Sequence, residues 1–194
     1  MLILKTRSQK LSRVSFDPSG RGLAAGGQRG VYWWQSVFDG SKPVCLDEGE
    51  CSGLGFTTKG EYLFAVVGKN RLAVFNLSDR RPSYVGLKVS ASTVAVCPAT
   101  GLAVTESWSG GEMVGWRVTD DGGLKRVWAT TVAPGSIGST VAFAGDGSWF
   151  VRAAQDPRRV EVLPTRDPRP RNGESDSRVS GRRVGEQWAG GVPG

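Results

Sequence analysis

Short runs in which apolar and polar residues alternate recur along most of the chain, and turns containing Gly or Pro separate them. The runs are four to eight residues long and rich in Val, Phe, Trp and Ala, as expected of strands with a buried face. Windows of helical length with a 3.6-residue apolar period are absent. The pattern therefore predicts an all-β chain of short antiparallel strands.

Four segments repeat one order of features: an apolar run, a turn that ends in glycine, a second run, a tight turn and a third run. The turn glycines are separated by 40, 41 and 46 residues, and they are Gly20, Gly60, Gly101 and Gly147. The apolar residues that close the third run are separated by 41, 41 and 47 residues, and they are Trp34, Phe75, Trp116 and Leu163. Two independent landmarks keep one period, which predicts four structural repeats.

A weaker apolar run lies between successive repeats, over residues 43–46, 84–89 and 127–132. It brings each repeat of about 40 residues to four strands, which is typical of a β-propeller blade. The predicted repeats cover about residues 11–50, 51–90, 91–136 and 137–164. Residues 1–10 offer a strand that would close the last blade of a ring. The closing aromatic residues are predicted to pack between blades, where each buries a large apolar area.

The turn over residues 16–24, Phe-Asp-Pro-Ser-Gly-Arg-Gly-Leu-Ala, resembles the Phe-Ser-Pro-Asp-Gly-x-x-Leu-Ala turn of WD-repeat β-propellers. Residues 143–147, followed by 159–163, are similar to the same turn and the third strand of that family. The resemblance spans about residues 11–164. It implies a β-propeller and a scaffold for protein–protein interaction.

The sequence also departs from the family pattern. Where the family has Trp-Asp, this chain has Trp34-Gln35, Phe75-Asn76, Trp116-Arg117 and Leu163-Pro164. The buried His/Asp network of the family cannot form, because the chain has no histidine. We therefore expect a degenerate propeller that is held by apolar packing and strand ladders.

The predicted fold is an all-β, β-propeller-like array of about four four-stranded antiparallel blades. Three arrangements fit that number of blades: an incomplete propeller, a ring closed by association with another chain, and a compact four-bladed ring. We favour them in that order, because the family usually closes with about seven blades. Residues 165–194 lose the strand period and are rich in Arg, Gly, Pro and Ser, which predicts a disordered tail.

The amino-acid composition excludes several kinds of catalytic and metal-binding site. The 194 residues include no histidine and three cysteines, so His-based catalysis and the usual zinc sites are excluded. Asp and Glu do not cluster in a catalytic pattern either. We therefore predict no enzyme activity, no cofactor and no metal. A truncated or vestigial propeller fragment without autonomous function is the alternative to a scaffold, and a propeller enzyme that depends on carboxylates or a metal is less favoured.

The formal net charge of +7 is concentrated at the N-terminus, where residues 1–30 carry six basic residues and one acidic residue. Such an edge suits an acidic partner. Nucleic acid is disfavoured, because the basic residues are not interleaved with stacking aromatic residues. No apolar stretch reaches the length of a membrane span. The N-terminus also lacks the order of a secretory signal, so we expect a cytoplasmic protein without a membrane contact.

A protein partner is expected, together with self-association that closes the ring as one arrangement. The candidate contact residues are of two kinds. Arg29, Arg71 and Arg158 recur in the hairpin before the third strand of three repeats, which would place them on one rim. Trp33 and Trp108 fall outside the packing register, and exposed aromatic and Arg side chains often anchor partners. The alternative interpretation of the arginines is that they are solvated loop residues.

Overall fold

The computed structural model describes residues 3–6, 10–68, 70–107, 109–132, 141–153 and 160–166. Fifteen strands account for the regular structure of these residues. They are β1 (Leu11–Phe16), β2 (Leu23–Gly27), β3 (Gly30–Trp34), β4 (Val44–Asp47), β5 (Cys51–Phe56), β6 (Tyr62–Val67), β7 (Arg71–Asn76), β8 (Pro82–Gly86), β9 (Thr93–Val96), β10 (Ala103–Glu106), β11 (Gly111–Val118), β12 (Leu124–Val132), β13 (Val141–Phe143), β14 (Trp149–Ala153) and β15 (Val160–Pro164). The all-β prediction is confirmed.

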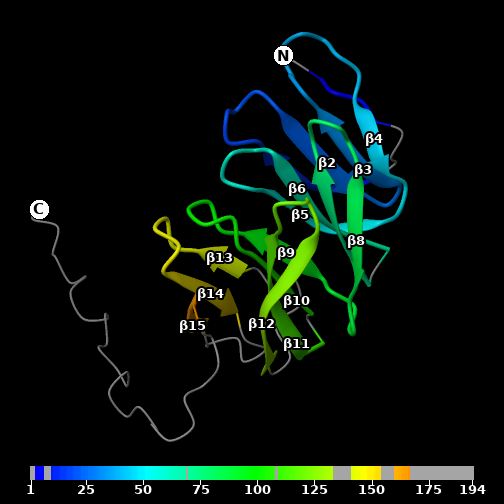
Figure 1. The fold of residues 1–194 in the computed structure, drawn as a ribbon. Coiled ribbons are helices and arrows are strands. Elements are labelled where there is room, and N and C mark those ends of the chain that lie inside the picture. The colour runs from blue at the N-terminus through cyan, green and yellow to red at the C-terminus, as the bar shows by residue number, and fades with distance from the viewer. Residues whose placement is uncertain are drawn as a thin grey trace, which may run out of the picture.

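The strands form four antiparallel sheets in which neighbours in sequence are neighbours in space. The first sheet has the order β1-β2-β3-β4, the second β5-β6-β7-β8 and the third β9-β10-β11-β12. The fourth sheet has the order β13-β14-β15 among the residues described. The first strands of successive sheets lie against one another, β1 beside β5, β5 beside β9 and β9 beside β13. Figure 1 shows the sheets following one another, with the first and the fourth at opposite ends.

The turn between the first and second strand has the same geometry in all four sheets. Its closing glycine has a φ of 70°, 73°, 67° and 71° at Gly20, Gly60, Gly101 and Gly147 respectively. This left-handed conformation favours glycine because a side chain would be strained there. Each of these glycines also donates its backbone N–H to a carbonyl three or four residues earlier. The period read from the glycines is therefore a period of the structure.

Each pair of neighbouring sheets encloses its own apolar core. Phe75 packs in the core between the first and second sheets, Trp116 between the second and third, and Leu163 against that between the third and fourth. Each landmark side chain thus faces the preceding sheet, as predicted for packing between blades. Trp34 is equally buried on the corresponding face of the first sheet, although no sheet precedes it among the residues described.

Both ends of the chain differ in detail from the expectation. Residues 3–6 do not form a strand, and Leu4 packs against the cluster that contains Trp34 instead of extending the fourth sheet. At the other end, the Thr165 N–H donates to the carbonyl of Ser148 at 3.0 Å and the residue is buried. The remainder of the predicted tail, residues 167–194, lies outside the described residues.

Among the described residues, none belongs to a helix with the length and apolar character that crossing a membrane requires.

Candidate functional site

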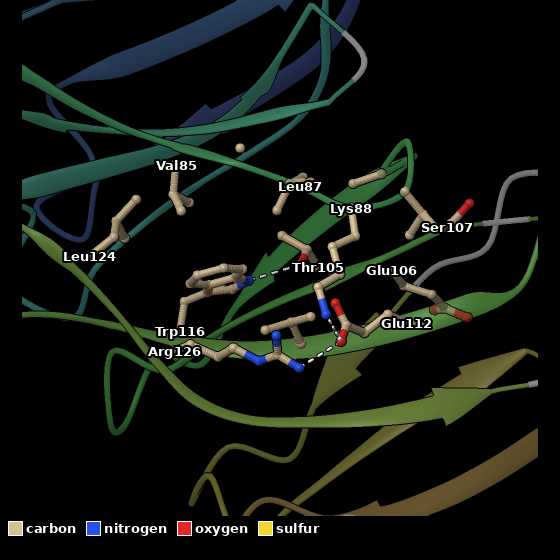
Figure 2. A pocket seen from close by; sticks show the side chains of 14 residues that line it. Val85, Leu87, Lys88, Thr105, Glu106, Ser107, Glu112, Trp116, Leu124 and Arg126 are labelled. Atoms are coloured by element: carbon tan, nitrogen blue, oxygen red, sulfur yellow. Dashed lines mark hydrogen bonds and ion pairs between the residues drawn. The ribbon is translucent and has the colours of Figure 1, made fainter.

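A groove of about 270 Å³ lies between the second and third sheets. One side is β8 with the segment that follows it, residues 87–91, and the other is formed by β10, β11 and β12. In Figure 2, Val85, Leu87 and Leu124 surround the ring of Trp116, while charged side chains gather beside them. The site thus combines an apolar part with a polar rim.

Trp116 forms the apolar floor. It is buried on β11, and its Nε1–H donates to the Thr105 Oγ1 of β10 at 2.9 Å. This bond satisfies the polar atom of the indole and fixes the ring, so its apolar surface faces the groove. A register shift between Gly115 and Trp116 separates this ring from Trp128, which lies on the opposite side of the sheet. A Cβ at position 115 would come within 2.4 Å of the Trp128 ring, so only glycine fits there.

The rim carries two cations around one carboxylate. The Arg126 guanidinium donates to the Glu112 Oε1 at 2.5 Å, and the Lys88 Nζ lies 3.9 Å from the same oxygen. The side chains of Lys88 and Arg126 are exposed, whereas that of Glu112 is half-buried. One positive charge of the three groups is uncompensated. The rim therefore favours an anionic group next to an apolar one.

Glu106 also borders the groove, but its carboxylate is turned toward the fourth sheet. Its Oε1 accepts from the Arg152 Nε at 2.8 Å, and Arg152 Nη1 donates to Glu161 Oε2 at 2.9 Å. The side chains of Glu106 and Arg152 are fully buried. Burial raises the pKa of Glu106, and the charge of Arg152 opposes that rise. This pair belongs to the interface between the third and fourth sheets rather than to the groove.

Two of the predicted contact residues lie in equivalent hairpins of adjacent sheets. Arg29 is exposed between β2 and β3, and its carbonyl accepts from the Tyr32 hydroxyl at 2.7 Å. Arg71 begins β7, where its guanidinium lies 5.1 Å from the Tyr84 ring centroid and 3.9 Å from Asp47 Oδ2. Arg71 is thus partly held by its own fold rather than freely solvated.

Tyr84 links this cluster across two sheets. Its hydroxyl donates to the Asp47 Oδ2 of β4 at 2.8 Å. Burial and the hydrogen bond to Asp47 raise the pKa of Tyr84 to about 12. The phenol therefore keeps its proton and bridges the outer strands of the first and second sheets. These contacts within the chain account for the position of the Arg71 side chain.

Trp33 corrects the expectation that it is exposed. It is buried between the first and second sheets, with its ring centroid 5.4 Å from that of Phe56. Its neighbour Trp34 is buried on the other face of the same sheet, because the first sheet is covered on both sides at β3. Sequence alternation alone could not reveal this double cover. The two other predicted contact residues, Trp108 and Arg158, lie outside the described residues.

None of the predicted contact residues lines the groove as the structure describes it. Its walls come from two different repeats, so no local spacing in the sequence joins Lys88 to Glu112 and Arg126. The one available signal was Trp116, which the repeat register assigned to packing. In the described ranges, no three His, Cys, Asp or Glu side chains are grouped to hold a metal ion.

Comparison with known proteins supports the architecture. No protein-family model and no curated protein matches the sequence. Among solved structures, the Cps50 (Swd1) β-propeller domain of Myceliophteria thermophila superposes with a TM-score of 0.66 at 15% identity, over 84% of this chain and 54% of that one. A functionally unknown protein of Desulfotomaculum acetoxidans gives 0.66 at 14%, over 82% and 53%. The chain spans about half the length of these structures, and at such identities the similarity establishes its fold, that of successive β-propeller blades.

Proposed function

We propose that this chain is a non-catalytic protein-interaction module of the WD-repeat type. The groove between the second and third sheets would hold an extended segment of a partner. An apolar side chain of that segment would lie over Trp116, and a neighbouring carboxylate would meet Lys88 and Arg126. The observation that carries the proposal is the uncompensated positive charge beside a fixed apolar floor.

The physical argument is one of complementarity. An apolar side chain gains most from a site that is already ordered, because little conformational entropy is lost on binding. The Nε1 bond to Thr105 provides that order at the indole. The exposed cations then select among apolar segments, since rim charges contribute mainly to specificity and to the association rate.

The test is selection from a library of random peptides on the full chain, followed by titration of the enriched peptides. We expect an apolar residue next to Asp or Glu, with micromolar dissociation constants. The double variant Lys88→Glu, Arg126→Glu should weaken binding at least tenfold. Lys42→Glu reverses an exposed charge that lies outside the groove, so it should bind like the wild type.

A further variant tests the apolar part of the groove. Leu87→Ser removes apolar surface from the groove wall and should weaken every enriched peptide, whether or not it is acidic. Enriched peptides without acidic residues, or equal losses in the Lys42→Glu control and the double variant, would overturn the assignment of the groove.

A further inference from the structure

The cross-strand landmark pairs permit a residue-by-residue alignment of the four sheets. Leu23 pairs with Trp34 in the first sheet, and the equivalent pairs follow in the others: Leu63 with Phe75, Ala103 with Trp116 and Phe150 with Leu163. Residues that lie the same number of positions from these pairs are structurally equivalent in the four sheets. Their burial can therefore be compared from sheet to sheet.

On the face turned toward the following sheet, equivalent residues are buried until the last sheet is reached. The third residue before the landmark is fully buried as Val31, Leu72 and Met113, but its equivalent Val160 is 66% exposed. Trp33 and Val74 are buried immediately before the landmark, whereas the equivalent Val162 is 60% exposed. Trp149 of β14, on the same face, is 50% exposed. Among the described residues, the fourth sheet thus presents an apolar face with no further sheet packed against it.

On the face turned toward the preceding sheet, the exception is the first sheet. Phe16 is 57% exposed and Val14 is 68% exposed on β1. Their equivalents two sheets on, Val94 and Val96, pack in the core against the second sheet. Leu4 and Val37 cover β2 and β3 on this face, over Ala25 and Trp34, and their neighbours Ile3 and Phe38 expose apolar side chains. The first strand is left open.

We infer that these two faces join, and that a second copy of this chain supplies the partner face at each end. The exposed face of the fourth sheet in one copy would pack against β1 of the other, and the reverse contact would close a two-fold ring. One copy spans 54% of the propeller domain it matches, so two copies supply about one circuit. Contiguous apolar faces of this kind commonly mark association sites.

The chemistry at the centre of the two faces is compatible with their joining. The residue of the first sheet that is equivalent to Arg152 of the fourth is Ala25. The residue of the fourth sheet that is equivalent to Glu106 of the third is Ala153. At these positions alanine would lie opposite alanine and no charge would be buried, once Leu4 and Val37, which cover Ala25 in the single chain, move aside. The interface between the first and second sheets has a similar pair, Gly26 and Ala65, at the same positions.

The mass of the full chain in solution tests the inference. We expect twice the 20.7 kDa of one chain by size-exclusion chromatography with light scattering. Val160→Asp with Val162→Asp should halve the mass, and so should Val14→Asp with Phe16→Asp. Val127→Asp is the matched control, because Val127 is an exposed valine of β12 outside both end faces. Circular dichroism should report the same β-rich spectrum for all variants.

Mixing the two end-face variants decides how the copies meet. In a head-to-tail ring the mixture contains one interface with both faces intact, so a heterodimer should reappear that neither variant forms alone. The inference is overturned if the wild type is a folded monomer, if it forms an open ladder of oligomers, or if only the fourth-sheet variant loses the dimer. A monomer that dimerises only after deletion of residues 167–194 would assign the face to that segment instead. None of these results bears on peptide binding in the groove.

Discussion

At one equivalent position of the repeat, the third sheet carries Thr105 and the fourth carries Arg152. The residue that faces this position from the preceding sheet is Val66 of the second sheet for Thr105, and Glu106 of the third sheet for Arg152. The interface between the second and third sheets is accordingly apolar, with Val66 and Phe64 in its core. The interface between the third and fourth sheets encloses an ion pair with fully buried side chains.

The difference shows what the repeat requires. Burial is common to both interfaces, whereas the chemistry at this position is free to change. A buried ion pair contributes little net stability, because desolvation offsets the attraction between the charges. Its effect on pairing is larger: opposite Val66, the buried Arg152 would keep the Glu161 carboxylate of its own sheet but would lose the carboxylate of Glu106. The pair therefore favours the fourth sheet after the third over other orders of similar sheets.

Removing one member of the pair should have the largest effect. Arg152→Met leaves the Glu106 carboxylate buried without its cation, and we expect a loss of about 4 kcal/mol in the free energy of unfolding. Glu106→Leu combined with Arg152→Met removes both charges and should recover all but about 1 kcal/mol. Urea denaturation of four proteins, the wild type, Arg152→Met, Glu106→Leu and the double variant, measures both values and the coupling between the two residues. Losses that simply add in the double variant would contradict the assignment of a coupled buried pair.

The apolar interface should respond to a cavity instead. Leu72 is fully buried between the second and third sheets, and Leu72→Ala should cost about 3 kcal/mol. Its cost should not depend on pH, because no charged group is left unpaired. Val127→Ala on the exposed side of β12 is the control and should change the free energy of unfolding by less than about 0.5 kcal/mol. A similar loss of stability in Leu72→Ala and Val127→Ala would contradict the assignment of Leu72 to a buried apolar interface.

The two interfaces should also differ, by a smaller amount, in how their contribution to stability depends on pH. Burial raises the pKa of Glu106 above its ordinary value of 4.5, so the folded protein binds this proton more tightly than the unfolded chain. Its contribution to stability is therefore present at low pH and is lost as the pH rises from 4.5 through the raised value. Glu106→Gln should remove this loss. The readout is the difference between wild type and variant in urea midpoint across a pH series.

That difference isolates Glu106 from other carboxyl groups. Hydrogen bonds from Ser41, Thr119 and Ser148 lower the pKa values of Asp39, Asp121 and Asp146 respectively. These groups act in the opposite sense and at lower pH, and they are common to wild type and variant. A midpoint difference that grows as the pH falls below 4.5 would reverse the assigned direction.

The alternation and the recurring turn glycines were sufficient to predict the sheets, because both are local properties. Gly147 reports a positive φ that depends on its own turn, and Trp116 reports the face of its own strand. The ion pair and the groove were not predictable in this way. Glu106 and Arg152 are 46 residues apart, and Lys88 and Arg126 belong to different repeats. Only the stacking of the sheets places such residues together.

The same stacking misled the interpretation of tryptophans. Trp33 breaks the register of the landmark residues and was expected on the surface. In the structure it is buried, because the second sheet covers its face of β3, while Leu4 and Val37 cover Trp34 on the other face. The cover on the second face comes from loop and terminal residues that carry no strand period. A repeat pattern identifies the strands but not the irregular segments that lie over them.

The smallest effect is expected at the rim of the groove, where an ion pair lies at the apolar interface but near solvent. Arg126 donates to Glu112 at 2.5 Å, and its side chain is exposed. Solvent screens such a pair, so Arg126→Ala should cost about 0.5 kcal/mol, and less in high salt. A double-mutant cycle with Glu112→Ala gives the coupling directly. Coupling above about 2 kcal/mol would place this pair with Glu106 and Arg152, and the contrast between a buried and a solvated ion pair would no longer distinguish the two interfaces.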